Sequence, residues 1–281
     1  MTASVPAEKP PSWGASRSGD RRLTALVLAG SRRGAADPVA ALAGQPTKAL
    51  VPVDGQPMLF RVVQSLRACP SVARVVVAAG DGPDAGEAAG LLHRSGCDTL
   101  AEPMGTAPSP AGTVSAALAS LGTPLLVTTA DHPLLRPAMV EEFLASVPPG
   151  VAAAAAVVEE ELFRAAFPRG RRTWLRFRDG GFSGCNLFLL ATPDAARIAG
   201  FWRRLEDNRK KPWRMAAAIG PAMLLGTLFR RLSLDDAARG LGRRTGTRLA
   251  AIRLSQPEAA IDVDKPDDLR LVETILSRRA A

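Results

Sequence analysis

The sequence LTALVLAG, residues 23–30, decides the fold, because a short apolar run that ends in glycine is typical of a buried parallel strand. A polar loop with several glycines and prolines follows from residue 31 to about residue 50. Pro57 then begins an amphipathic helix that runs to about residue 68, since proline is tolerated in the first helical turn. Ligands of open α/β sheets bind beyond the carboxyl ends of the strands, so we expect a binding site in the loop after Gly30.

Apolar runs and helix-like segments alternate along the rest of the chain. This spacing predicts βαβ units, and therefore a three-layer α/β/α domain around a mostly parallel sheet. The expected strands cover residues 74–79, 124–129, 151–158, 174–178, 185–190, 248–254 and 259–263. The expected helices cover residues 84–93, 111–120, a segment from 137, 193–242 with breaks near 211–212 and 220–221, and 267–278.

The composition of the 281-residue chain indicates one folded domain with a tail. Hydrophobic residues make up 47% and charged residues 22%, which excludes a wholly disordered protein. Residues 1–21 are rich in proline, serine and charge and are expected to be disordered, which leaves 22–281 as the domain. We expect a cytoplasmic protein, because no long apolar leader is visible and three widely spaced cysteines make neither a disulfide framework nor a CxxC zinc site.

An excess of positive charge, +9 from 36 Lys and Arg against 27 Asp and Glu, narrows the class of partner. Such a balance suits nucleic acid, an anionic membrane surface or phosphorylated small molecules. The sequence has no recognisable nucleic-acid module and no tyrosine, and aromatic residues make up 5%, so stacking platforms for bases are scarce. We therefore expect phosphate-bearing small molecules as partners, and no nucleic acid.

Three motifs with candidate functional residues lie where predicted strands end or where the chain enters its last predicted helix. None of them is a P-loop or a Rossmann fingerprint, because both glycine patterns are absent. They are LAG (28–30) with KAL (48–50) and GQPML (55–59), then ADHP (130–133), and finally IDVDKPDDL (261–269).

The order of these motifs resembles that of the MobA-like NTP transferases, which are nucleotidyltransferases of the GT-A-like fold. The resemblance implies that the first loop wraps a triphosphate and that Lys48 contacts phosphate. Arg32 and Arg33 would add charge-assisted hydrogen bonds to those of the backbone N–H groups. Ser31 replaces the second glycine of the family pattern, and Thr47 replaces its proline. The candidate nucleotide-binding residues are Leu28, Ala29, Gly30, Ser31, Arg33, Lys48, Gly112 and Thr113, and the candidate catalytic residues are Lys48, Arg32 and Asp131.

Simpler interpretations of these residues stay open. Gly30 and Gly34 would then be ordinary loop glycines and Lys48 a solvated charge, while Thr113 would be the N-cap of a helix. The ordered series of matches from residue 28 to residue 59 favours the binding interpretation.

Carboxylates of the second and third motifs are candidate ligands of Mg²⁺, which takes one or two protein carboxylates together with phosphate and water. The resemblance implies that Asp131 binds the metal. Alternation along the expected strand 259–263 puts Asp262 and Asp264 on one side, and Asp264 is the better second ligand because it is nearer the end of the strand. In the alternative interpretation Asp131 caps a turn and the other two belong to an ordinary strand-to-helix connection.

Two further residues are candidates for holding the acceptor substrate. The resemblance implies this role for Asn186, whose alternative is a strand-end side chain that bonds to the backbone. Arg176 belongs to a basic cluster, residues 164–178, and arginine binds phosphate in bidentate fashion. The same cluster would also suit a solvated β-ribbon.

A basic segment, residues 199–250, has no counterpart in the short MobA-like pattern and is expected to be a helical insertion. Its apolar part, residues 215–229, is too short and too broken to span a membrane. With Trp202 and Trp213 beside basic pairs, it suits a peripheral contact at an anionic membrane surface, a lid or a dimer contact. The plainest interpretation is a set of helices packed over the sheet with arginines outward.

The sequence therefore predicts an enzyme that transfers a nucleoside monophosphate from an NTP to a phosphorylated small-molecule acceptor, with Mg²⁺ as cofactor and pyrophosphate as the second product. The alternative is a nucleotide-binding or scaffold protein with weakened catalysis on the same fold, because Ser31 and Thr47 depart from the family pattern. The expected location is the cytoplasm, with peripheral contact at the inner face of the membrane through residues 199–250 as an additional hypothesis.

Overall fold

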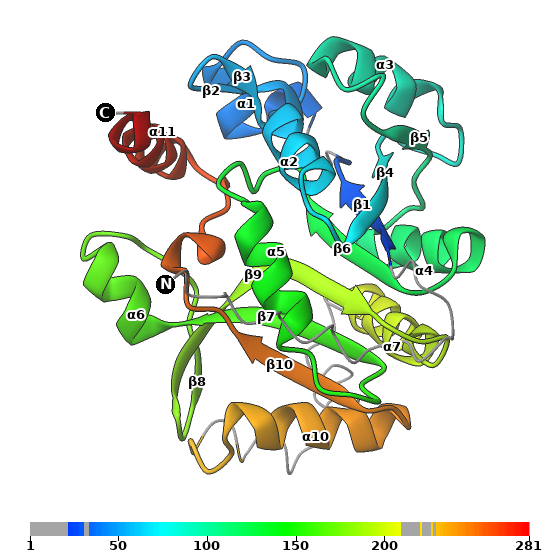
Figure 1. Cartoon of the computed structure of the whole chain (residues 1–281), viewed down its shortest axis with the longest axis vertical. Coiled ribbons are helices and arrows are strands. Elements are labelled where there is room, and N and C mark those ends of the chain that lie inside the picture. Colours follow the sequence, from blue (N-terminus) through cyan, green and yellow to red (C-terminus); the bar gives the residue numbers. More distant parts are fainter. Residues whose placement is uncertain (1–21, 31–33, 209–219, 221–225, 227–228, 281) are drawn as a thin grey trace, which may run out of the picture.

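The computed structural model describes residues 22–30, 34–208, 220, 226 and 229–280, and an eight-stranded sheet runs through its centre (Figure 1). The strands of this sheet are β1 (Leu23–Leu28), β4 (Val72–Ala78), β5 (Glu102–Met104), β6 (Leu125–Thr129), β7 (Ala153–Glu159), β8 (Leu175–Phe177), β9 (Gly180–Leu190) and β10 (Leu249–Arg253). Their order is β10-β7-β9-β6-β1-β4-β5, with β8 paired to β9, and β2 (Pro52–Val53) and β3 (Gln56–Pro57) form a separate small hairpin.

The sheet is parallel except around β9. Strand β1 is parallel to both of its neighbours, with Leu26 opposite Val76 of β4 and Val127 of β6. Strand β9 is antiparallel to β6, β7 and β8, whereas β10 is parallel to β7. The predicted mostly parallel sheet is confirmed, and the carboxyl ends of β1 and β6 lie side by side.

The alternation of side chains along β1 separates two apolar layers. Leu23, Ala25 and Val27 belong to the large core, whereas Leu26 and Leu28 belong to a second core on the opposite face. The first face is covered by α2 (Met58–Arg67), α3 (Gly86–Ser95) and α5 (Pro137–Ala145), and the second by α4 (Pro110–Leu121) and α7 (Ala195–Asp207) (Figure 1). The other α-helices of the described residues are α1 (Pro38–Leu42), α6 (Glu160–Ala166), α10 (Leu234–Thr245) and α11 (Pro266–Ala280).

Local sequence explains why these helices begin where they do. Ser109 caps α4, because its side chain accepts the N–H of Gly112 at 3.1 Å and Pro110 occupies the first turn. Asp37 caps α1 in the same way, with its carboxylate accepting the N–H groups of Val39 at 2.9 Å and Ala40 at 3.3 Å. Each such cap contributes about 1 kcal/mol. The long loop expected after β1 therefore contains a short helix that periodicity did not predict.

The strand expected at 259–263 is wrong. Residues Pro257–Ala260 form a short 3₁₀ helix, and Pro257 at its first position suits that turn better than a strand interior. One bond ties the following segment to the end of the sheet, from the N–H of Val263 to the carbonyl of Asp131 at 2.9 Å. That bond brings the third motif alongside the second.

The basic segment 199–250 is described only in part. Its first residues belong to α7, where Trp202 packs against Phe188 of β9 with ring centroids 6.0 Å apart. This part therefore covers the sheet, in agreement with the plainest interpretation of the segment. Helix α10 follows further on, and Trp213 and most of the apolar part lie outside the described residues, as do residues 1–21. Within the described ranges, no helix combines the length and apolarity needed to cross a membrane.

Candidate active site

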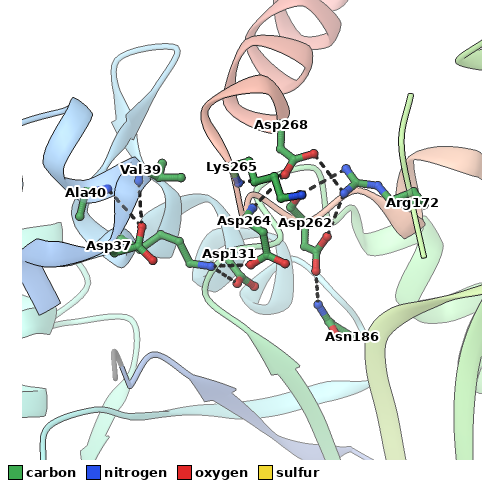
Figure 2. Close-up of polar contacts among 11 residues, drawn as sticks. Asp37, Val39, Ala40, Asp131, Arg172, Asn186, Asp262, Asp264, Lys265 and Asp268 are labelled. Carbon is green, nitrogen blue, oxygen red and sulfur yellow. Dashed lines mark hydrogen bonds and ion pairs between the residues drawn. The ribbon is translucent and has the colours of Figure 1, made fainter. Parts of the chain in front are cut away.

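The side chain of Lys48 joins the three sequence motifs. Its Nζ lies 2.6 Å from Oδ2 of Asp131 and 3.0 Å from Oδ1 of Asp264. Lys48 begins a short 3₁₀ helix after the first loop, Asp131 follows β6, and Asp264 precedes α11 (Figure 2). Residues that are 83 and 216 positions apart in the chain therefore meet at the carboxyl end of the parallel strands.

The electrostatics of this cluster favour a charged lysine. Burial lowers the pKa of Lys48, but the carboxylates of Asp131 and Asp264 outweigh that effect and hold the pKa above its usual value. The second oxygen of the Asp131 carboxylate, Oδ1, is buried and has no hydrogen-bond partner among the described residues. Asp131 thus retains an acceptor that a cation or a donor of a ligand can use.

Asp262 has different partners from Asp264, although the two are separated by one residue. Arg172 Nη1 lies 3.2 Å from Oδ1 of Asp262 and 3.1 Å from Oδ1 of Asp268 in α11. Asn186 donates from Nδ2 to Oδ2 of Asp262 at 2.9 Å (Figure 2). Asp264 is thereby left to face Lys48, while Asp262 is fixed on the far side of the cluster.

The position of Asn186 depends on an irregularity in β9. The pairing of β7 with β9 shifts between Ala155 and Val157, and Asn186 adopts a φ of 48°, in the left-handed region. Asparagine tolerates this conformation better than most residues, and bulges turn side chains toward sites at the end of a sheet. The bulge therefore explains how a strand residue reaches the third motif.

Burial perturbs two more titratable groups near the cluster. Burial and the charges of Asp131 and Asp264 raise the pKa of Asp262 to about 6, although Arg172 opposes them. Burial lowers the pKa of His132 to about 4, against the opposing effect of the Asp131 carboxylate. His132 is therefore neutral at pH 7 and is packed inside the protein rather than presented to a ligand.

Two clefts open on the Lys48 cluster. The first, of about 530 Å³, runs along the end of β1 at Leu28, Ala29 and Gly30 toward Trp202. The second, of about 770 Å³, passes the beginning of α4, including Thr113, toward Gly80 and Asp81. Both are lined by Lys48, Asp131, Asn186 and Asp264, so the polar cluster lies where the two clefts meet.

Most of the predicted site residues lie together here. Gly112 does not line the second cleft, and its N–H is bonded to the Ser109 side chain. Ser109, and not Thr113, is therefore the N-cap of α4. Arg176 lies on β8 and pairs with Glu160 at 3.0 Å, outside the two clefts. Ser31, Arg32 and Arg33 lie outside the described residues. The predicted residues that line one or both clefts are Leu28, Ala29, Gly30, Lys48, Thr113, Asp131, Asn186, Asp262 and Asp264.

Two residues of the site were not predicted from the sequence. Asp37 lines the first cleft, and the Asp-Pro pair at residues 37–38 is a helix-start signal that marks it in retrospect. Arg172 fixes Asp262 and Asp268 with a side chain that is 8% exposed. No feature of the sequence separates it from the other arginines of its cluster, because its role depends on contacts across 90 residues.

The donor set around Lys48 suits Mg²⁺ only together with a ligand. Among the described residues no group of three or more side chains could hold a metal by itself. Two carboxylates, Asp131 and Asp264, approach one cation, the Lys48 ammonium, and Asp131 Oδ1 is unpartnered within the described part of the chain. Mg²⁺ commonly takes two protein carboxylates and completes its shell with phosphate and water, so these residues fit it.

Comparison with known proteins places this geometry in a class. A family model described as MobA-like NTP transferase domain matches residues 25–253. A hypothetical transferase from Thermus thermophilus is 31% identical, with a TM-score of 0.73 over 88% of this chain and 99% of the other. The CMP:2-keto-3-deoxy-manno-octonic acid synthetase complexed with CTP (14% identity, TM-score 0.55, 91% and 98% covered) and 4-diphosphocytidyl-2C-methyl-D-erythritol synthase (14%, 0.56, 92% and 100%) share the fold. No curated protein matches the chain.

The fold and the family match define a nucleotidyltransferase of the GT-A-like class. The chain belongs to the MobA-like NTP transferase domain family, as its motifs suggested, and the predicted fold and enzyme class are confirmed.

Proposed function

We propose that the protein transfers a nucleoside monophosphate from an NTP to a phosphorylated small molecule. An oxygen of the acceptor phosphate attacks the α-phosphorus and forms the new P–O bond. The bond from the α-phosphorus to the bridging oxygen breaks, and pyrophosphate leaves with the electron pair. The observation that carries the proposal is the Lys48 ammonium held between Asp131 and Asp264 where two clefts meet.

The first cleft supplies a place for the triphosphate. The small residues Ala29 and Gly30 let backbone groups approach phosphate oxygens, and Lys48 supplies a charged donor in the same cleft. The contribution of Arg32 and Arg33 to the same phosphates stays a prediction from the sequence. Catalysis by such a site depends on position and electrostatics, because phosphoryl groups require little covalent assistance.

Asp131 and Asp264 are the residues that would hold Mg²⁺. Bound Mg²⁺ supplies charge neutralisation at the phosphate under attack. Lys48, which pairs with both carboxylates, would be free to bind the β- and γ-phosphates if a divalent cation took its place between Asp131 and Asp264. Lys48 then holds the charge that develops on the departing pyrophosphate.

The second cleft supplies a place for the nucleoside. It passes the N-terminal turn of α4, where Ser109 and Pro110 are half-buried and belong to its lining. Thr113 Oγ1 already accepts the N–H of Ala107 at 3.0 Å and is buried, so it shapes the wall of the cleft. Thr106, which also lines the cleft, binds the Gly80 carbonyl at 2.6 Å and fixes the opposite side.

A pyrophosphate-release assay tests the proposal. The wild-type protein is incubated with each of ATP, GTP, CTP and UTP, with Mg²⁺ and a panel of phosphorylated acceptors, and Asp131→Asn is the inactive comparison. Asp194→Asn is a matched control, because Asp194 is an exposed carboxylate whose partner is Arg197. Release that is equal in wild type and Asp131→Asn contradicts the proposal. Nucleotide binding without release across the panel supports the non-catalytic alternative.

The cytoplasmic location and the peripheral membrane contact are separate proposals. For the contact, the described part of residues 199–250 offers exposed arginines such as Arg203, on a helix whose apolar face packs on the sheet. Co-sedimentation with vesicles that contain or lack anionic lipid tests it. If the protein sediments with neither type of vesicle, the membrane contact is contradicted.

A further inference from the structure

A third cleft, of about 1110 Å³, lies between the segment 166–173 and helix α11. One end of this cleft is formed by Asn186, Asp262 and Asp264, which also line the second cleft. The third cleft thus opens directly on the cluster that faces the triphosphate. It is large enough for a ligand of several hundred cubic ångströms rather than a single phosphate ion.

Residues 169–173, which carry two exposed arginines of this cleft, are anchored to the protein at Gly170 and Arg172. Exposure alternates along it: Arg169, Arg171 and Thr173 are exposed, whereas Gly170 and Arg172 are partly buried. A Cβ added to Gly170 would come within 2.7 Å of the Phe163 ring, and Arg172 is anchored to Asp262 and Asp268. Arg169 and Arg171 are therefore presented along the cleft by a segment that is fixed at alternate positions.

The charges of the cleft do not balance. Each acidic residue in its lining has a partner: Arg172 for Asp262 and Asp268, Lys48 for Asp264, and Arg270 for Asp267. Four basic residues of the lining form no ion pair within the described part of the chain. They are Arg169, Arg171, Lys265 and Arg278.

We propose that this cleft binds the acceptor, and that the acceptor carries a second anionic group in addition to its reacting phosphate. The inference rests on the proposed nucleotidyl transfer. The reacting phosphate would lie at the shared end, beside Asp264 and Lys265, where it can reach the α-phosphorus. The second phosphate or carboxylate would be bound by Arg169, Arg171 and Arg278, because arginine pairs with such groups in bidentate fashion.

The cleft also has an apolar side that suits the body of such an acceptor. Phe167, Leu175, Leu271 and Ile275 belong to its lining, and Leu175 is 56% exposed although it is a large apolar residue. A carbon skeleton that spans two anionic groups would cover this surface. The class of acceptor is therefore a phosphorylated organic molecule with an apolar or ring portion and a further anionic group.

Calorimetric titration with two probes tests the proposal. The probes are fructose 1,6-bisphosphate and fructose 6-phosphate, at constant ionic strength and with EDTA, against wild type, Arg169→Ser, Arg171→Ser and Arg278→Ser. We expect the bisphosphate to bind wild type at least about tenfold more tightly than the monophosphate, and each variant to lose about tenfold, the effect of one charge-assisted contact. Arg243→Ser is the matched control, an exposed arginine of α10, which lies far from α11 in Figure 1.

The outcomes separate this inference from the proposed function. Equal binding of the two probes, no binding of either, or the same loss in Arg243→Ser overturns the acceptor cleft. The protein could instead bind vesicles of phosphatidic acid, lose that binding in the arginine variants, and fail to bind the soluble bisphosphate. That result would contradict a soluble acceptor. Titration of NTP is the parallel measurement: the three variants are expected to bind NTP like wild type. Probe binding in the cleft together with absent pyrophosphate release would contradict the enzyme and leave the anion cleft established.

Discussion

Lys48 and Asp131 form an ion pair of 2.6 Å, and the same ammonium reaches Asp264 at 3.0 Å. One positive charge therefore partly neutralises two carboxylates that would otherwise repel each other at the end of the sheet. A ligand that brings both a cation and phosphates can offer new partners to both groups at once. The cation can bind the two carboxylates, and a phosphate can bind the Lys48 ammonium. We therefore expect nucleotide and metal binding to rearrange this pair.

Asp131→Asn is predicted to abolish most of the transfer activity while the fold is retained. The amide keeps the shape of the side chain but removes the negative charge, so kcat should fall about 10²–10³-fold or more, as when one preorganised electrostatic contact is lost. Pyrophosphate release gives the rate and circular dichroism confirms the fold. Activity within threefold of wild type would exclude Asp131 from the reaction.

Lys48→Met is predicted to separate nucleotide binding from metal binding. Loss of the ammonium should raise the KM for NTP, because phosphate loses a charged donor. It should also tighten the binding of Mn²⁺ in the absence of nucleotide, since Asp131 and Asp264 no longer share their charge with a lysine. Electron paramagnetic resonance of free Mn²⁺ measures this affinity, with Arg243→Ser as control. Weaker Mn²⁺ binding in Lys48→Met would contradict the competition.

Arg172→Met is predicted to destabilise the protein, because it leaves Asp262 and Asp268 without their cationic partner in a poorly exposed place. Removing one member of a buried pair costs about 3–5 kcal/mol, and partial exposure of the carboxylates reduces this to roughly 2–3 kcal/mol. The double variant Arg172→Met/Asp262→Asn should recover part of the loss. Urea unfolding measures each value, and equal stabilities of single and double variants would contradict the pairing.

His132 is predicted to make the protein lose stability in acid. Its folded pKa of about 4 lies below the ordinary 6.5, so the unfolded chain binds a proton between these values and the folded protein does not. The stability is present above pH 6.5 and is lost as the pH falls toward 4, by up to roughly 3 kcal/mol. The difference in unfolding free energy between wild type and His132→Leu, measured in EDTA, should follow this slope. A difference independent of pH contradicts it.

Asp262 is predicted to make the protein lose stability as the pH rises, over nearly the same pH range as His132. Its folded pKa of about 6 lies above the ordinary 3.8, so the folded protein retains a proton that the unfolded chain has released. This contribution is present below pH 3.8 and is lost as the pH rises through 6, by roughly 2 kcal/mol after allowance for partial exposure. Asp262→Asn should therefore become more stable relative to wild type from pH 4 to pH 6. A constant difference would contradict the raised pKa.

Regular periodicity explains why much of the fold could be predicted from the sequence. The apolar run at 23–30 and the later runs at 74–79 and 124–129 became the parallel centre of the sheet. The strand expected at 259–263 failed because alternation of apolar and acidic residues also suits an extended connection, whose backbone bond at Val263 goes to Asp131 beyond the end of β6. Periodicity reports which side chains are buried, but it does not report whether a neighbouring strand is available.

The site could be predicted as far as local motifs reach. Lys48, Asp131 and Asp264 each stand in a recognisable motif, and the fold brings the three together. Arg172 and Asp37 could not be singled out in advance. Arg172 matters through partners 90 or more positions away, and Asp37 is visible in the sequence only as a helix cap. Long-range contacts of irregular segments leave no periodic trace along the chain.

The contributions to the Lys48 cluster come from opposite ends of the described chain. Lys48 follows β1, whereas Asp264 lies in the segment that precedes α11. During synthesis on the ribosome, a nascent chain can assemble β1, β4 and β6 well before the second carboxylate has left the exit tunnel. The Lys48 cluster can therefore be completed only after residue 264 and the start of α11 have emerged, long after the central strands.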